Sequence, residues 1–236
     1  MAVGSGIALS PYLLTSLSPN LLNMTRLVIL DFDGTLADTQ PIIIASIQAT
    51  LRELHLPERT EAECRTIIGL PLAECFTTLC GVDDTLAERC ADVYRRVFDE
   101  LNTDGTVRLF PHVLETIKTL HDRGLQLAIC SSRGRPTLQS FVRDFGLEAY
   151  VSMIVSANDV QHHKPHPEPV QKILAALGVA PEEAVMVGDA SYDILMGRAA
   201  GCRTVGVTYG NQTAADLRAA GADHLIDDFM KLNEIR

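Results

Sequence analysis

The chain has 236 residues, of which 30 are Asp or Glu and 20 are Lys or Arg, so its formal net charge is -10. This acidic balance argues against non-specific nucleic-acid binding and against attraction to an anionic membrane surface. Hydrophobic residues make up 47% of the chain and charged residues 21%, which is typical of a soluble globular protein with a substantial core.

The cysteines do not suggest a metal ribbon or a redox motif, because no two of them form a C-x-x-C pair. A chain of this length does not need disulfides for stability, so we expect free thiols in a reducing cytoplasm. The six cysteines are Cys64, Cys75, Cys80, Cys90, Cys130 and Cys202.

Residues 1–24 differ from the rest of the chain, and we expect them to be an N-terminal extension outside the fold. They carry no charged side chain and are rich in Ser, Leu and Pro. A secretory signal would need a basic start and a compact apolar stretch, whereas Ser-Pro pairs interrupt this segment at residues 10–11 and 18–19. No run is long enough to span a membrane, so no membrane partner is expected. Met24 is a candidate natural start.

Short apolar runs predict strands that are buried on both faces, as in a parallel sheet. Three of these runs end at a polar residue: Asp31, Ser131 and Asp189 each stand just past a strand end. The predicted strands cover residues 27–30, 125–130, 153–155, 184–187 and 204–207.

Helical patterns alternate with these strands, and a glycine suited to a C-cap follows each helix. The alternation predicts an α/β fold, a Rossmann-like parallel sheet flanked by helices. Ligands in such folds lie beyond the carboxyl ends of the strands. The predicted helices cover residues 113–123, 137–145, 168–177 and 192–200.

The stretch from residue 39 to residue 109 breaks this alternation, because its pattern is almost entirely helical. We interpret it as a small all-α domain inserted into an α/β core made of residues 25–38 and 110–236. Its predicted helices cover residues 42–54, 61–68, 72–80 and 84–102.

The sharpest chemical signal is Asp31-Phe32-Asp33-Gly34-Thr35. Gly34 permits the chain to turn after the strand, and this turn can bring the carboxylates of Asp31 and Asp33 to one site. Asp31 can attack phosphorus as a nucleophile, and Asp33 can exchange protons with the leaving group and with water. A lone D-x-D-G is more often an ordinary turn.

Three further elements support the chemical interpretation. Lys164, in the loop after the fourth strand, can bind both a carboxylate and a phosphate. Ser131 and Ser132 can donate hydrogen bonds to phosphate oxygens. Asp189 and Asp193 are four residues apart at a helix start, and carboxylate oxygens are the ligands that Mg²⁺ prefers.

Four other residues carry weaker signals. His162, His163 and His166 suggest a metal site, although loop histidines beside prolines more often face solvent. Arg133 is close enough in sequence to Ser131 to approach a substrate anion, and the alternative is a position on the surface.

The four elements, in this order and with these residue types, resemble the haloacid dehalogenase superfamily, and specifically its phosphatase branch with a small helical cap. The resemblance extends over residues 26–226. It implies Asp31 as nucleophile, Asp33 as acid and base, and a mobile cap formed by residues 39–109.

The resemblance also implies the ligands. Ser131 and Lys164 would bind phosphate, with Ser132 and Gly34 beside them. Mg²⁺ would be the cofactor, held by Asp31, the backbone carbonyl of Asp33, and Asp189, with Asp193 orienting bound water or Lys164.

Family members differ in chemistry, and this sequence narrows the choice. Dehalogenases lack the second acid, which Asp33 supplies. Phosphonatases need a lysine in the cap, and none lies between residues 41 and 110. β-Phosphoglucomutases usually carry an arginine in the stretch that corresponds to residues 69–72, where this chain has none.

Segments 66–72, 206–210 and 220–227 are most similar to phosphoglycolate phosphatases. We therefore expect a cytoplasmic phosphatase, monomeric or homodimeric, that acts on a small phosphorylated metabolite, with 2-phosphoglycolate as the first candidate. A pyrophosphatase or a sugar-phosphate phosphatase is the alternative. A phosphomutase or a non-catalytic regulatory module is less favoured, since all four motifs are intact.

Overall fold

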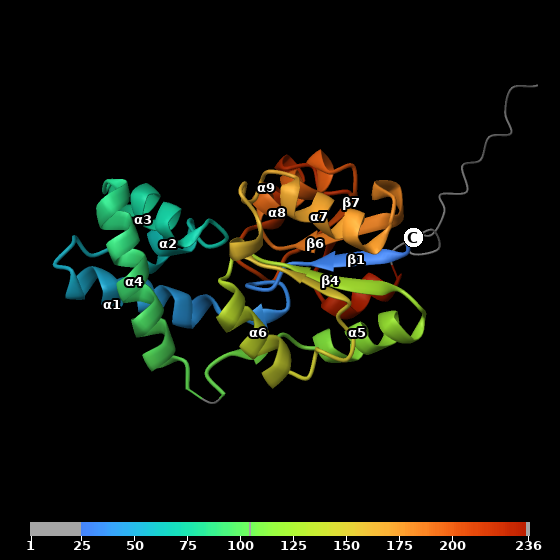
Figure 1. Ribbon diagram of the computed structural model, residues 1–236, viewed down its shortest axis with the longest axis horizontal. Coiled ribbons are helices and arrows are strands. Elements are labelled where there is room, and N and C mark those ends of the chain that lie inside the picture. Colours follow the sequence, from blue (N-terminus) through green and yellow to red (C-terminus); the bar gives the residue numbers. More distant parts are fainter. Residues whose placement is uncertain (1–24, 104, 235–236) are drawn as a thin grey trace, which may run out of the picture.

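The computed structural model describes residues 25–103 and 105–234 (Figure 1). The expected extension of residues 1–24 therefore lies outside the described residues. Six parallel strands form one sheet in the order β5-β4-β1-β6-β7-β8, and the central β1 pairs with both β4 and β6. The strands are β1 (Leu27–Leu30), β4 (Gln126–Cys130), β5 (Met153–Val155), β6 (Ala184–Gly188), β7 (Arg203–Val207) and β8 (His224–Ile226).

The sheet is covered on both faces, which explains why β1, β5 and β6 consist of apolar residues and glycine alone. Alternate side chains of β1 enter two different cores: Val28 and Leu30 belong to one cluster, and Leu27 and Ile29 to the other. Figure 1 shows α7, α8 and α9 on one side of the sheet, and α5 and α6 on the other. These helices are α5 (Val113–Asp122), α6 (Arg135–Asp144), α7 (Glu168–Leu177), α8 (Ser191–Ala199) and α9 (Ala214–Ala219).

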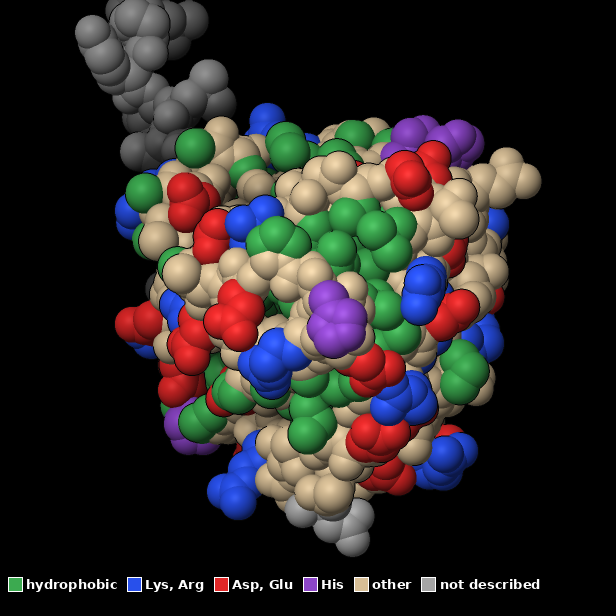
Figure 2. All heavy atoms as spheres, turned by 90° about the vertical axis from the view of Figure 1, so that its left-hand side faces the viewer, with side chains coloured by type: hydrophobic (Ala, Val, Ile, Leu, Met, Phe, Trp, Pro, Cys, Tyr) green, Lys and Arg blue, Asp and Glu red, His purple; other side chains and the backbone are tan. Residues whose placement is uncertain are grey.

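Four helices between β2 (Ala37–Asp38) and β3 (Arg108–Leu109) form what we call the helical insert. β2 and β3 pair antiparallel, so the chain leaves and re-enters the α/β core at one place. Figure 2 faces the insert and shows hydrophobic side chains among charged ones on its surface. The helices are α1 (Gln40–Glu53), α2 (Glu61–Arg65), α3 (Leu72–Cys80) and α4 (Asp84–Leu101).

The predicted α/β fold with its helical insert is confirmed, and five of the six strands lie where the sequence placed them. The second insert helix, α2, is shorter than the predicted range of residues 61–68. It ends at Arg65, and turns follow it. Its start is fixed by a capping box, in which the Thr60 side chain accepts the Glu63 N–H and Glu63 accepts that of Thr60. The 3₁₀ turns are Ala157–Asp159, Pro181–Glu183 and Phe229–Glu234.

The cysteines are all free thiols, in agreement with the sequence interpretation. The part of the chain that the structure describes contains no helix with the length and apolarity needed to cross a membrane.

Candidate active site

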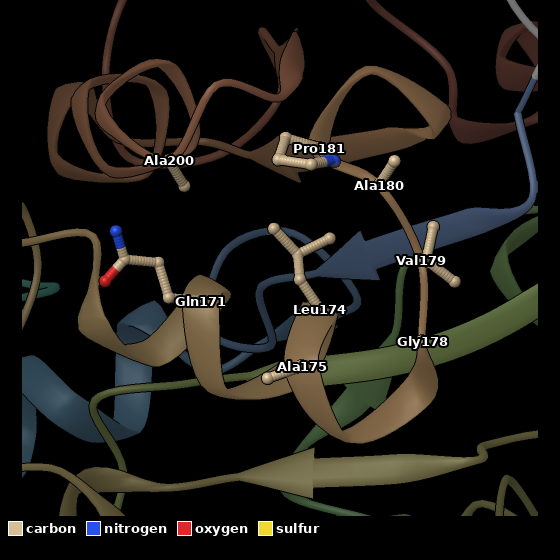
Figure 3. Close-up of a pocket in the computed structure, with 8 residues that line it drawn as sticks. All are labelled: Gln171, Leu174, Ala175, Gly178, Val179, Ala180, Pro181 and Ala200. Carbon is tan, nitrogen blue, oxygen red and sulfur yellow. The ribbon is translucent and has the colours of Figure 1, made fainter.

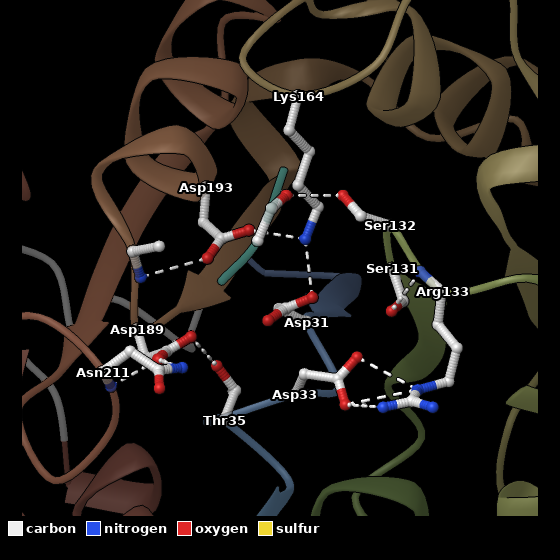
Figure 4. Close-up of polar contacts among 12 residues, drawn as sticks. Asp31, Asp33, Thr35, Ser131, Ser132, Arg133, Lys164, Asp189, Asp193 and Asn211 are labelled. Atoms are coloured by element: carbon white, nitrogen blue, oxygen red, sulfur yellow. Dashed lines mark hydrogen bonds and ion pairs between the residues drawn. The ribbon is translucent and has the colours of Figure 1, made fainter. Parts of the chain in front are cut away.

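Three strand ends meet at one edge of the sheet (Figure 4). Asp31 follows β1, Ser131 follows β4, and Asp189 follows β6. Because β4 and β6 flank β1, their carboxyl ends bring these three side chains together, and all three are buried. The strand pattern in the sequence therefore predicted that these three side chains lie close together, as the structure has them.

Lys164 joins two of the acids. Its Nζ lies 2.6 Å from Asp31 Oδ1 and 2.6 Å from Asp193 Oδ1, and all three side chains are almost completely inaccessible. Burial alone would lower the pKa of Lys164, but Asp193 and Asp31 outweigh it and raise the pKa well above its ordinary value. The lysine is therefore a fixed positive charge between two carboxylates.

Asp189 is held by residues that the sequence analysis did not identify. The backbone N–H and the side-chain amide of Asn211 both donate to Asp189 Oδ2, each at 2.6 Å. The Thr35 hydroxyl donates to Asp189 Oδ1 at 3.3 Å. Asn211 lies four residues beyond the end of β7, so its place in the loop after a predicted strand was the only sequence signal for it.

The charge balance of the site fits a divalent cation. Asp31, Asp189 and Asp193 place carboxylate oxygens within 4.8 Å of one another, and Lys164 supplies a single positive charge. Burial, followed by Asp193, raises the pKa of Asp189 to about 7 and that of Asp31 well above its ordinary value. An all-oxygen donor set with unbalanced negative charge is what Mg²⁺ prefers.

The turn after β1 explains the glycine at position 34. Gly34 has φ +83° and donates its N–H to Ala37 O at 2.9 Å. A side chain there would collide with Asp189 and Asn211, so the position requires glycine both for conformation and for space.

Asp33 is bound by Arg133, which the sequence analysis considered as a contact of the substrate anion or as a surface residue. Arg133 binds its carboxylate through Nε at 3.1 and 3.2 Å and through Nη2 at 2.6 Å. The Arg133 side chain is only 8% exposed, so the surface position considered above is wrong. Its guanidinium also stacks over Phe98 of α4 and Phe141 of α6.

The two serines after β4 have different environments. Ser131 is buried, and its hydroxyl oxygen accepts the Arg133 N–H at 3.2 Å. Ser132 instead donates its hydroxyl to the carbonyl of Gly69 in the helical insert, at 2.7 Å. The Ser132 hydroxyl therefore connects the two parts of the molecule.

A groove lies elsewhere on the surface, between α7 and the end of α8 (Figure 3). None of the eight residues that line it has an ionisable side chain. It therefore lacks charged groups that could bind a phosphate.

Comparison with known proteins agrees with this geometry. Residues 28–207 match the profile of the haloacid dehalogenase-like hydrolase family. The chain belongs to this family. It is a phosphatase of the family, related to proteins named for two substrates. Pyrophosphatase PpaX of Bacillus pumilus is 42% identical over 182 residues, which cover 77% of this chain and 82% of that protein.

Phosphoglycolate phosphatase of Salmonella typhimurium is 33% identical over 229 residues, which cover 88% of this chain and 90% of that protein. Among solved structures, a haloacid dehalogenase-like hydrolase of Bacteroides fragilis has a TM-score of 0.84 at 30% identity, over 88% of this chain and 99% of that one. A structure titled as a predicted phosphoglycolate phosphatase of Haemophilus somnus has a TM-score of 0.81 at 26% identity, over 89% and 97%.

Proposed function

We propose that this chain is a Mg²⁺-dependent phosphatase that hydrolyses a small phosphorylated metabolite through an aspartyl-phosphate on Asp31. The contact of Lys164 with both Asp31 and Asp193, beside Asp189, carries this proposal. It supplies a buried carboxylate, a fixed cation for the phosphate and a donor set for the metal in one place.

Asp31 is the nucleophile in this proposal. Lys164 is bound to Oδ1, so Oδ2 is the oxygen that we assign to the attack on phosphorus. Lys164 and the Ser131 hydroxyl bind the non-bridging phosphate oxygens, with the Gly34 turn beside them. The P–O bond to the leaving group breaks as the Asp31–phosphorus bond forms.

Asp33 is the acid and base. It gives a proton to the leaving-group oxygen, and its carboxylate then takes a proton from the water that hydrolyses the aspartyl-phosphate. Arg133 holds the Asp33 carboxylate in one orientation between these steps.

Asp31, the backbone carbonyl of Asp33, and Asp189 are the residues that would hold Mg²⁺, with Asp193 orienting Lys164. When bound, Mg²⁺ offsets the repulsion between the Asp31 carboxylate and the phosphate dianion. Asn211 and Thr35 fix the Asp189 carboxylate in position, which is the usual role of groups behind metal ligands.

Residues 39–109 act as the cap in this proposal, and residues 25–38 and 110–236 as the core. The bond from Ser132 to Gly69 and the stacking of Arg133 on Phe98 bring the insert against the site. Closure of the cap would exclude bulk water and present the residues that contact the leaving group.

Two substrates are candidates, and both have an anionic leaving group. 2-Phosphoglycolate is favoured by relatives such as the Salmonella enzyme, whose match covers most of both chains. Pyrophosphate is favoured by the higher identity to the Bacillus enzyme. Arg133 is the buried cation on the insert side of the site, and it suits either anion.

The test is a comparison of kcat/KM for 2-phosphoglycolate, pyrophosphate and a set of sugar phosphates, with and without Mg²⁺. Asp31→Asn should abolish turnover and formation of the phosphoenzyme. Asp38→Asn is the matched control, because Asp38 is exposed on the same segment. Substantial Mg²⁺-dependent activity in Asp31→Asn would remove Asp31 as the nucleophile.

A further inference from the structure

The loop that carries Lys164 contains a second group of possible metal ligands. His162, His166 and Glu168 each place one nitrogen or oxygen within 4.8 Å of the others. The two imidazole rings lie side by side, with centroids 4.4 Å apart, and His162 Nδ1 is 2.9 Å from Glu168 Oε2. His162 and His166 are exposed, as the sequence analysis favoured, and the fold brings both of them to one carboxylate.

The Glu168 carboxylate is held in place by its neighbours. Glu168 begins α7, its side chain is 18% exposed, and it accepts the backbone N–H groups of Gln161 and His162 at 3.0 and 2.9 Å. These hydrogen bonds hold the pKa of Glu168 far below its ordinary value, so it stays a carboxylate. Lys172 contacts the other oxygen, Oε1, and leaves Oε2 on the side of the histidines.

The donor set differs from that of the acidic site. Two imidazole nitrogens and one carboxylate oxygen suit Zn²⁺, whereas Mg²⁺ prefers oxygen ligands alone. Ligands around a tetrahedral zinc lie about 3.3 Å apart, and the three ligand atoms lie within 4.8 Å of one another, so each pair would need to adjust its separation by at most about 1.5 Å. The imidazoles can do so, because both histidines are exposed, and their exposure leaves a fourth position for water.

We propose that His162, His166 and Glu168 bind a zinc-class divalent cation at a site separate from the acidic cluster. The ligands lie on both sides of Lys164, two residues before it and two and four residues after it. A bound cation would therefore join the two ends of the segment from which Lys164 reaches Asp31. A cation that binds the folded state and not the unfolded chain also stabilises the folded state.

The experiment uses the full chain, stripped with a chelator and returned to excess Mg²⁺ so that the acidic site is saturated. Zinc chloride is titrated by calorimetry into the wild type, His162→Ala and His166→Ala. His163→Ala is the matched control, because His163 is in the same loop but not in the group. Both substituted imidazoles in the test variants are exposed, so we expect these variants to fold.

We expect one zinc per chain in the wild type and in His163→Ala, and binding weakened by at least about tenfold in each of the other variants. Zinc should raise the melting temperature of the wild type and of His163→Ala more than that of the two test variants. Co²⁺ should give a spectrum without a thiolate charge-transfer band.

Three results would overturn the proposal. They are no saturable zinc binding by the wild type, unchanged affinity in both His162→Ala and His166→Ala, and a thiolate-to-cobalt band, which would place the ion on cysteine.

Discussion

Arg133 binds the carboxylate of Asp33 from two of its nitrogens, at 2.6 to 3.2 Å, although the two residues are 100 positions apart. The pair is largely buried, with side-chain exposures of 8% and 14%. Arg133 also packs on Phe98 of the insert and on Phe141 of the core, with its guanidinium carbon 4.7 and 5.2 Å from the ring centroids. One side chain thus connects the proposed acid and base with both parts of the molecule.

Arg133→Met should lower kcat by about 10 to 100-fold, because Asp33 loses the group that orients it. Loss of one partner from a buried ion pair should also destabilise the fold, by at most about 3–5 kcal/mol. Steady-state kinetics and urea unfolding measure the two effects.

Two further variants separate orientation from charge. Arg133→Lys keeps the charge but not the two-nitrogen contact, so it should recover stability better than kcat. Arg135→Met is the matched control. Arg135 is two residues after Arg133 in the chain and forms a more exposed ion pair, with Asp159. A kcat for Arg133→Met equal to that of the Arg135 variant would contradict a role in orienting Asp33.

The sequence predicted the fold well because buried parallel strands are continuous apolar runs. β8 was missed because it begins with His224 and only two of its three residues are apolar, whereas β5, which is equally short, consists of three apolar residues. The order of the strands did not follow from their pattern. It depends on the pairing of β1 with β4 and β6, which are far from it in sequence.

The site was predicted to the extent that its residues stand at strand ends. Asp31, Ser131 and Asp189 were found in this way, and their proximity followed from the parallel sheet. The partners of those residues were harder to predict. The contacts of Arg133 with Asp33 and of Ser132 with Gly69 join distant segments, and neither local pattern indicates its partner.

Lys164→Met should reduce kcat/KM by about 10² to 10³-fold at saturating Mg²⁺, because the phosphate loses its fixed cation. It would also leave the carboxylates of Asp31 and Asp193 without their shared positive charge. Lys172→Met is the control, since Lys172 is 45% exposed on α7 and its side chain contacts Asp159 O and Glu168, away from the acidic cluster. Equal activity of the two variants would exclude Lys164 from the reaction.

Mg²⁺ should stabilise the wild type by about 2.7 kcal/mol at 100 times its dissociation constant. Asp189→Asn should lose most of this gain, because it removes a proposed ligand, whereas Asp38→Asn should retain it. Thermal melts with and without a chelator measure the difference. An equal response to Mg²⁺ in Asp189→Asn would contradict a cation at this site.

The same variant tests the electrostatics of the metal-free protein. Burial and Asp193 raise the pKa of Asp189 to about 7, so the folded state binds this proton more tightly than the unfolded chain does. The Asp189 contribution to stability should therefore fall as the pH rises from about 4 to about 7. In the presence of a chelator, Asp189→Asn should lose less stability than the wild type over this range. A steeper loss in the variant would contradict the raised pKa.

Ser131→Ala and Ser132→Ala should have different effects, although the residues are adjacent. Ser131 is the proposed phosphate ligand, and its loss should reduce kcat/KM by about 10²-fold. The Ser132 hydroxyl is already donated to Gly69 in the insert, so its loss should mainly weaken that contact, by about 0.5–1.5 kcal/mol. We expect a rise in KM with little change in kcat, since closure of the insert would be less favourable. A fall in kcat as large as that of Ser131→Ala would instead support the original interpretation of Ser132 as a phosphate ligand.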